Sequence, residues 1–95
     1  MRRFNMTRKE MVTKVIDGDT FITGSRKNSV RLANVNAPEK GTPGAAAATR
    51  TLRDLIQGED VIIDTVARDK YGRSVANVKL GNRSVNAAMK RKGYK

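Results

Sequence analysis

The sequence predicts a mainly β fold with helices (α+β), in which five strands form a barrel and two α-helices pack on it. Stretches rich in apolar and β-branched residues occur three times before residue 36 and twice after residue 59. An amphipathic helical stretch separates the two groups, and a shorter helical stretch follows the last strand. Short strands that close on themselves leave no exposed edge, which favours a barrel over an open antiparallel or mixed sheet.

The first three strands are expected between Glu10 and Val35. The first covers residues 10–16 and ends at the turn Asp17-Gly18-Asp19. The second covers residues 20–23, which are β-branched or aromatic, and Phe21 is expected in the core. A polar hairpin loop then leads to a third strand at residues 29–35.

The clearest helix follows an irregular stretch, residues 36–43, which contains two prolines and one glycine. Thr42 is the expected N-cap, Pro43 suits the first helical position, and Gly58 ends the helix. Its apolar residues recur at helical spacing and predict one face that packs on the barrel: Ala48, Leu52, Leu55 and Ile56.

The second half of the chain predicts strands at residues 60–66 and 74–80, joined by a turn at residues 69–72. A short helix is expected from Val85 to Lys92, with Ser84 as its N-cap. This order and number of strands fits an OB-type barrel.

Length and charge predict one domain with a polyanionic partner. The chain has 95 residues and a net charge of +11, and we assign residues 10–95 to the domain and residues 1–9 to a disordered basic arm. Much of the excess charge lies in the two ends: Arg2, Arg3, Arg8, Lys9, Lys90, Arg91, Lys92 and Lys95. Basic ends favour nucleic acid, because phosphate contacts release counterions, although they also keep a small protein soluble.

The sequence contains no cysteine and no histidine. Thiolate nucleophiles, disulfides, Cys/His zinc sites and imidazole acid–base catalysis are therefore excluded. No run of apolar residues is long enough to span a membrane, and the first residues do not resemble a signal peptide. We expect a monomer without a membrane partner that stays in the cytoplasm. The alternative is that the chain is the mature or trimmed form of a secreted protein.

A few polar residues suggest phosphodiester chemistry. Asp19, on a turn with Asp17, is a candidate oxygen ligand for Ca²⁺, although Asp-Gly is also an ordinary hairpin turn. Arg31 should point to the face opposite its apolar neighbours, and Arg73 follows a Tyr-Gly turn. Arginine suits bidentate phosphate recognition, although Arg31 alone would also fit a solvent-facing role.

Glu39 follows Pro38 in the irregular loop and is a candidate general base. The competing interpretation is an exposed loop carboxylate. None of these residues is specific alone, and the combination in this order is what points to a site.

The same residues carry a resemblance that covers roughly residues 11–94: the chain resembles the staphylococcal nuclease (thermonuclease) family. Four blocks carry it, in order: Val15-Ile16-Asp17-Gly18-Asp19-Thr20; Val30-Arg31-Leu32 continuing to Val35-Asn36-Ala37-Pro38-Glu39; Asp69-Lys70-Tyr71-Gly72-Arg73; and Val85-Asn86-Ala87-Ala88-Met89 with Gly93 behind it.

The resemblance implies an OB-fold barrel that hydrolyses DNA and RNA with Ca²⁺ and prefers single strands; Mn²⁺ and Mg²⁺ are alternative metals. By position, it implies metal binding by the Asp19 carboxylate and the Ala37 carbonyl. It implies that Glu39 activates water and that Arg31 and Arg73 hold the scissile phosphate. It further implies nucleotide contacts from two more residues, Lys70 and Tyr71.

The chain departs from the family pattern in two ways. Asn36 stands where the family usually has a metal-binding Asp. Its amide oxygen can still bind the metal, but one negative charge is lost and weaker Ca²⁺ binding is expected. Family members also commonly continue into a further helical segment. A catalytically weak nucleic-acid-binding OB module is therefore the alternative function. A protein-interaction domain is a third interpretation.

Overall fold

A computed structural model describes residues 7–95. Six strands and two helices follow in the order β1 (Thr7–Asp17), β2 (Thr20–Thr23), β3 (Val30–Leu32), α1 (Ala45–Ile56), β4 (Asp60–Arg68), β5 (Ser74–Leu80), β6 (Arg83–Ser84) and α2 (Val85–Arg91). None of the helices in this part of the chain is long and apolar enough to cross a membrane.

Five of the strands form a closed, mixed barrel, as the sequence predicted. Neighbours pair in the order β3-β2-β1-β4-β5, and β3 also pairs with β5. This last pairing is parallel, with Val30 opposite Ser74 and Leu32 opposite Ala76. It removes both sheet edges. The two-residue β6 extends the far end of β5.

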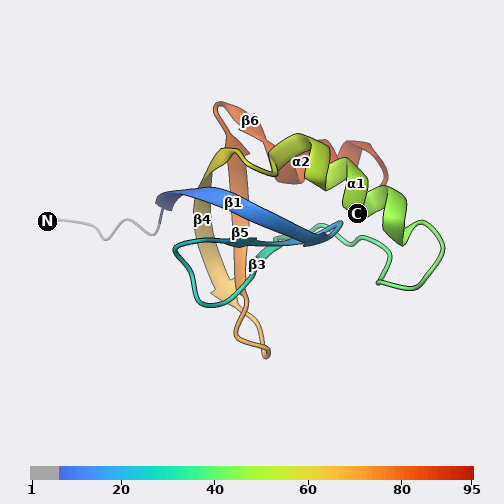
Figure 1. The fold of residues 1–95 in the computed structure, drawn as a ribbon, viewed down its shortest axis with the longest axis horizontal. Coiled ribbons are helices and arrows are strands. Elements are labelled where there is room, and N and C mark those ends of the chain that lie inside the picture. The colour runs from blue at the N-terminus through green and yellow to red at the C-terminus, as the bar shows by residue number, and fades with distance from the viewer. Residues whose placement is uncertain (1–6) are drawn as a thin grey trace, which may run out of the picture.

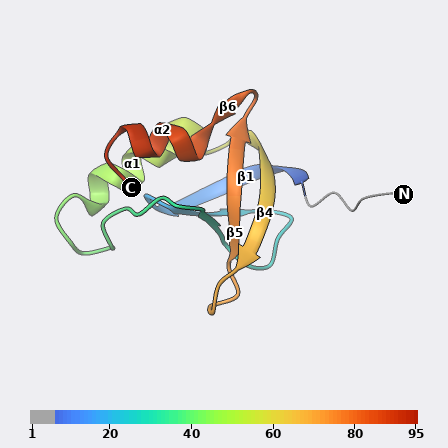
Figure 2. The same ribbon diagram turned by 180° about the vertical axis from the view of Figure 1, so that it is seen from behind.

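Both helices lie on the same side of the barrel (Figures 1 and 2). α1 packs on β1, and α2 packs on β5. The apolar face predicted for α1 is confirmed, with Ala48, Leu52 and Ile56 buried. Leu52 and Ile56 join a continuous core with Phe21, which is fully buried as expected, and with residues from every strand of the barrel. Leu55, the fourth residue of the predicted face, is partly buried against this core.

Several element boundaries differ from the prediction. α1 begins at Ala45, not at Pro43, with Gly44 as its N-cap in a left-handed conformation. The expected cap, Thr42, instead donates its hydroxyl to the Glu39 carbonyl. Its side chain therefore closes a turn before the helix.

The bounds of β3 and β1 also differ from the prediction. β3 spans only Val30–Leu32, because Asn34 adopts a left-handed φ of 60° and turns the chain. β1 begins at Thr7, so Thr7–Lys9 pair with β4 rather than belonging to the expected arm. The rest of that arm, residues 1–6, lies outside the described residues. In contrast, β5 has the predicted bounds, and Ser84 caps α2 by accepting a hydrogen bond from the Ala87 amide, as expected.

A buried carboxylate, Glu10, organises one end of the barrel. It accepts hydrogen bonds from Thr23 (2.7 Å), Ser25 (2.9 Å) and the Arg26 Nε, at 2.9 and 3.0 Å. Burial acts to raise the pKa of Glu10. The three hydrogen bonds and the positive charge of Arg26 outweigh burial, so the pKa lies below its ordinary value.

The depressed pKa predicts an acid-sensitive fold. The ionised Glu10 contributes stability that is fully present above its unfolded pKa and is lost as the pH falls through the lower, folded value. Urea denaturation of the wild type and of Glu10→Gln should therefore be measured from neutral to acid pH, to give the free energy of unfolding of each protein against pH. Their difference is expected to be largest near neutrality and to shrink as the pH falls. A difference independent of pH would contradict this role of the carboxylate.

Candidate active site

One polar cavity of about 260 Å³ gathers most of the candidate residues. Its walls come from the β1–β2 turn, from β3 with the loop that follows it, and from Arg73 at the end of the β4–β5 turn. The parallel pairing of β3 with β5 brings Arg31 and Arg73 to the same cavity. The complete lining is Asp17, Asp19, Arg31, Asn36, Ala37, Pro38, Glu39, Lys40 and Arg73.

The Asp19 side chain is held by three contacts. It is largely buried. One carboxylate oxygen accepts a hydrogen bond from the Thr20 hydroxyl at 2.9 Å, and the other accepts one from the Ala37 amide at 3.2 Å. The second oxygen also lies 3.4 Å from Nη2 of Arg31. These contacts fix the carboxylate between the β1–β2 turn and the loop after β3.

Arg31 lies within β3 and points away from the core, as its position between two buried apolar residues predicted. Its Nη1 donates to the Leu32 carbonyl at 2.9 Å, and its Nη2 donates to Oδ1 of Asn36 at 3.0 Å. A single guanidinium therefore connects the oxygens of Asp19 and Asn36.

Arg73 is held by its own turn. Asp69 accepts hydrogen bonds from the Arg73 amide at 2.9 Å and from the Arg73 Nε at 2.6 Å. Desolvation acts to raise the pKa of Asp69, but the hydrogen bonds from Arg73 and from the Tyr71 amide keep it below its ordinary value. The Arg73 side chain is thus oriented toward the cavity by an ionised carboxylate.

Lys70 and Tyr71 lie on the same β4–β5 turn but do not line the cavity. Tyr71 is 71% exposed, with the Lys70 ammonium 5.3 Å and the Arg73 guanidinium 5.4 Å from its ring centroid. An aromatic face flanked by two cations suits contact with a nucleotide base and its phosphate.

Glu39 lines the cavity from the loop before α1, and its side chain is exposed. Its carboxylate makes no hydrogen bond or ion pair within residues 7–95. It is therefore available to accept a proton from a ligand.

Among the carboxylates that line the cavity, Asp17 is the one to which the sequence interpretation gave no role. Its carboxylate accepts a hydrogen bond from the Asp19 amide at 3.1 Å. Burial, followed by the neighbouring Asp19 carboxylate, raises the pKa of Asp17. The signal was present in the sequence, since two carboxylates flank one glycine, but an Asp-Gly turn is too common to identify a ligand.

The oxygen donors of the cavity fit a hard divalent cation such as Ca²⁺, Mn²⁺ or Mg²⁺. Asp17 and Asp19 are close enough for their charges to disfavour each other, which a cation would relieve. No group of three Asp, Glu, His or Cys side chains is spaced to hold a metal in the part of the chain that the structure describes. Amide, carbonyl and water oxygens would have to complete such a site.

A family model described as "Staphylococcal nuclease homologue" matches residues 29–95. The chain belongs to the staphylococcal nuclease family. Within this family it is 36% identical over 93 residues to a thermonuclease of Staphylococcus intermedius, covering 87% of this chain and 55% of that protein.

A second relative in the family is an uncharacterized endonuclease of Haemophilus influenzae, 33% identical over 85 residues, with 86% of this chain and 48% of that protein covered. A third, an uncharacterized endonuclease of Escherichia coli, is 38% identical over 69 residues, with 70% of this chain and 45% of that protein covered. The chain thus spans about half the length of the relatives that it matches.

Proposed function

We propose that this protein is a metal-dependent nuclease that hydrolyses phosphodiester bonds of DNA or RNA, with Ca²⁺ as the metal and single strands as the preferred substrate. The observation that carries the proposal is the single cavity shared by two guanidiniums, two Asp carboxylates and a glutamate that has no partner within residues 7–95. The relatives named as nucleases support the same reaction class.

The proposed roles follow from which side chains in the cavity already have hydrogen-bond partners and which do not. Glu39, which has no partner within the described residues, takes a proton from the attacking water. Arg31 and Arg73 hold the non-bridging phosphate oxygens and stabilise the charge that develops on them. Tyr71 and Lys70 contact the neighbouring nucleotide, since the exposed Tyr71 ring can stack on an unpaired base.

Three residues would hold the metal: Asp19 through its carboxylate, Asn36 through its amide oxygen and Ala37 through its carbonyl. The Asp17 carboxylate lies in the same cavity. When bound, Ca²⁺ would act as a Lewis acid on the phosphoryl group. Mn²⁺ and Mg²⁺ are the alternative cations for this donor set.

A nucleic-acid-binding module with little turnover is the second candidate. It is favoured by the hydrogen bond from Arg31 to Asn36, because that contact uses an oxygen proposed as a metal ligand and a guanidinium proposed for the phosphate. The net charge of +11 would still support binding.

Incubation with fluorescently labelled single-stranded DNA and RNA separates the two candidates. Cleavage that requires Ca²⁺ and stops on addition of a chelator would support the nuclease. Binding without cleavage in Ca²⁺, Mn²⁺ and Mg²⁺ would contradict the nuclease proposal and support the nucleic-acid-binding module. A duplex of the same sequence tests the expected preference for single strands.

Asn36→Asp is expected to bind Ca²⁺ about tenfold or more tightly than the wild type, a difference of about 1.4 kcal/mol or more. The substitution adds one negative charge to the proposed ligands with little change in shape. Calorimetric titration of both proteins with Ca²⁺ measures the difference, with Asn77→Asp on the exposed face of β5 as the control for net charge. Equal affinity in all three proteins would contradict a metal-binding role for residue 36.

A further inference from the structure

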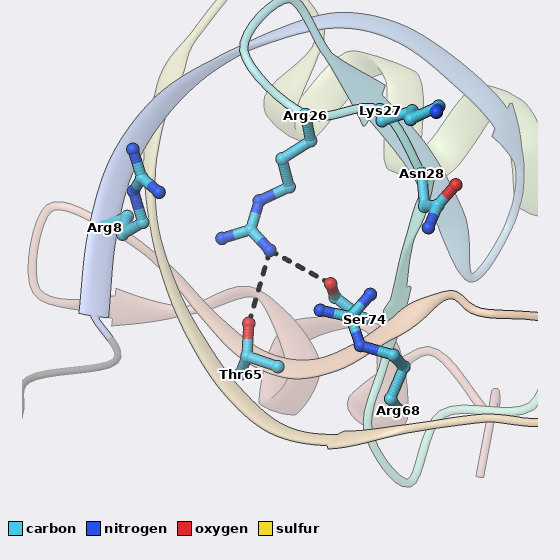
Figure 3. Close-up of a pocket in the computed structure, with 7 residues that line it drawn as sticks. All are labelled: Arg8, Arg26, Lys27, Asn28, Thr65, Arg68 and Ser74. Carbon is cyan, nitrogen blue, oxygen red and sulfur yellow. Dashed lines mark hydrogen bonds between the residues drawn. The ribbon is translucent and has the colours of Figure 1, made fainter.

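A second pocket, lined largely by cations, lies outside the proposed active site (Figure 3). It has a volume of about 440 Å³ and is formed by the start of β1, the β2–β3 loop, the end of β4 and Ser74 of β5. Four of its lining residues are basic, Arg8, Arg26, Lys27 and Arg68, and no carboxylate lines it within the described chain. We infer that this pocket binds a phosphate group of the nucleic-acid backbone away from the bond that is cleaved.

The floor of the pocket is preorganised to bind an anion. The Arg26 guanidinium is fixed by Glu10 through Nε and by Ser74 through Nη1, the latter at 3.0 Å. Thr65 is a longer partner of Nη1, at 3.4 Å. Its remaining nitrogen, Nη2, has no hydrogen-bond partner within residues 7–95. Figure 3 shows this nitrogen on the Arg8 side of the pocket, with no dashed line drawn to it. A guanidinium that is already oriented loses little entropy when it binds.

The charge of the pocket exceeds what its internal partners neutralise. Glu10 pairs closely with Arg26 at 2.9 Å, while Arg8 approaches it only to 3.9 Å and is 70% exposed. Lys27 and Arg68 are exposed and have no carboxylate partner among the described residues. Three cations therefore surround one neutralised pair, and phosphate is the ligand chemistry that such a site favours.

The pocket is connected to the proposed active site by the β4–β5 turn. Arg68 Nη1 donates to the Gly72 carbonyl at 3.1 Å. Next along the chain, Arg73 lines the active-site cavity, while Ser74 lines this pocket. The exposed Lys70 and Tyr71 lie on the same turn, between Arg68 of the pocket and Arg73 of the cavity in the sequence. The identity of the polyanion rests on the proposed function, whereas the anion site itself rests on the pocket.

The test is the salt dependence of strand binding by the double variant Arg8→Gln/Lys27→Gln. Both side chains are exposed, so the fold should persist. The probe is a labelled thymidylate strand longer than about 16 nucleotides, the upper site size for an OB fold, in chelator to prevent cleavage. Removing two phosphate contacts should reduce the slope of log affinity against log salt by about 1.4. The matched control, Arg53→Gln/Lys79→Gln, removes one exposed arginine and one exposed lysine outside the pocket.

A site-specific readout accompanies the binding curves. Titration with inorganic phosphate should shift the backbone amide resonances of Asn28, Thr65 and Ser74 in the wild type and in the control. The double variant, which keeps Arg26 and Arg68, should need a higher phosphate concentration for the same shift. Equal slopes for the double variant and the control would overturn the inference. Binding to anionic phospholipid vesicles that depends on Arg8 and Lys27, with no slope change on the strand, would also overturn it in favour of a membrane.

The outcomes separate this inference from the proposed function. If the wild type cleaves strands but the double variant shows no change in the salt slope, the nuclease proposal stands and the second site is rejected. If the wild type cleaves no strand, yet the salt slope falls in the double variant and not in the control, the second site stands and the nuclease proposal is rejected.

Discussion

Glu39→Gln is expected to slow strand cleavage by about 10²–10⁴-fold, the usual contribution of a general base. Glutamine has nearly the same shape but cannot accept the proton of the attacking water. Because the Glu39 carboxylate is exposed and has no partner within the described residues, the free energy of unfolding should change by less than about 0.5 kcal/mol. Single-turnover cleavage of a labelled strand measures the effect, and a thermal melt checks the fold.

Glu59→Gln is the matched control, because it makes the same chemical change at another exposed carboxylate that does not line the cavity. It should cleave at the wild-type rate. Strand binding in chelator should not weaken in either variant, since each loses one negative charge and neither loses a cation that contacts the backbone. If Glu39→Gln cleaves within a few-fold of the wild type, another group must accept the proton, and the assignment fails.

Most helices and strands could be predicted from the sequence because the spacing of apolar residues along a short segment determines them. The helical spacing of Leu52 and Ile56 reports the buried face of α1, and β5 has the expected bounds. The start of α1 was missed because the Thr42 hydroxyl can either accept a hydrogen bond from a helix amide, as an N-cap, or donate one to a nearby carbonyl, and in the structure it donates to the Glu39 carbonyl. The start of β1 was missed because Thr7–Lys9 are ordered by pairing with β4, which is distant in sequence.

The site was predictable as a set of residues but not as a set of contacts. The motif blocks identified Arg31 and Asn36, but the hydrogen bond between them depends on how the loop after β3 folds back. The network of Glu10 and Arg26 was missed for the same reason. Those residues are 16 apart in sequence and meet only when the barrel forms. A lone Glu in a strand gives no sign that it will be buried.

The second large effect is expected at a glycine. Gly18→Ala should destabilise the fold by about 3 kcal/mol, at the upper end of the usual range for overpacking. A Cβ at Gly18 would lie 2.5 Å from the Cβ of Ala37 and 2.6 Å from the Cβ of Ala48. It would also lie 3.2 Å from the backbone carbon of Ala48, so a side-chain rotation cannot relieve the contact. Urea denaturation of the variant measures the change.

The same substitution is expected to affect the site, because Gly18 joins its two halves. It lies between Asp17 and Asp19, while Ala37, which it contacts, donates its amide to Asp19. Relief of the clash must separate the β1–β2 turn from the loop after β3 or from α1, and either movement displaces an oxygen proposed to bind the metal. Gly24→Ala is the control, since its Cβ would meet only Thr13 at an ordinary 3.5 Å. If Gly18→Ala is as stable and as active as Gly24→Ala, the close packing of the turn against Ala37 and Ala48 is not what positions Asp19.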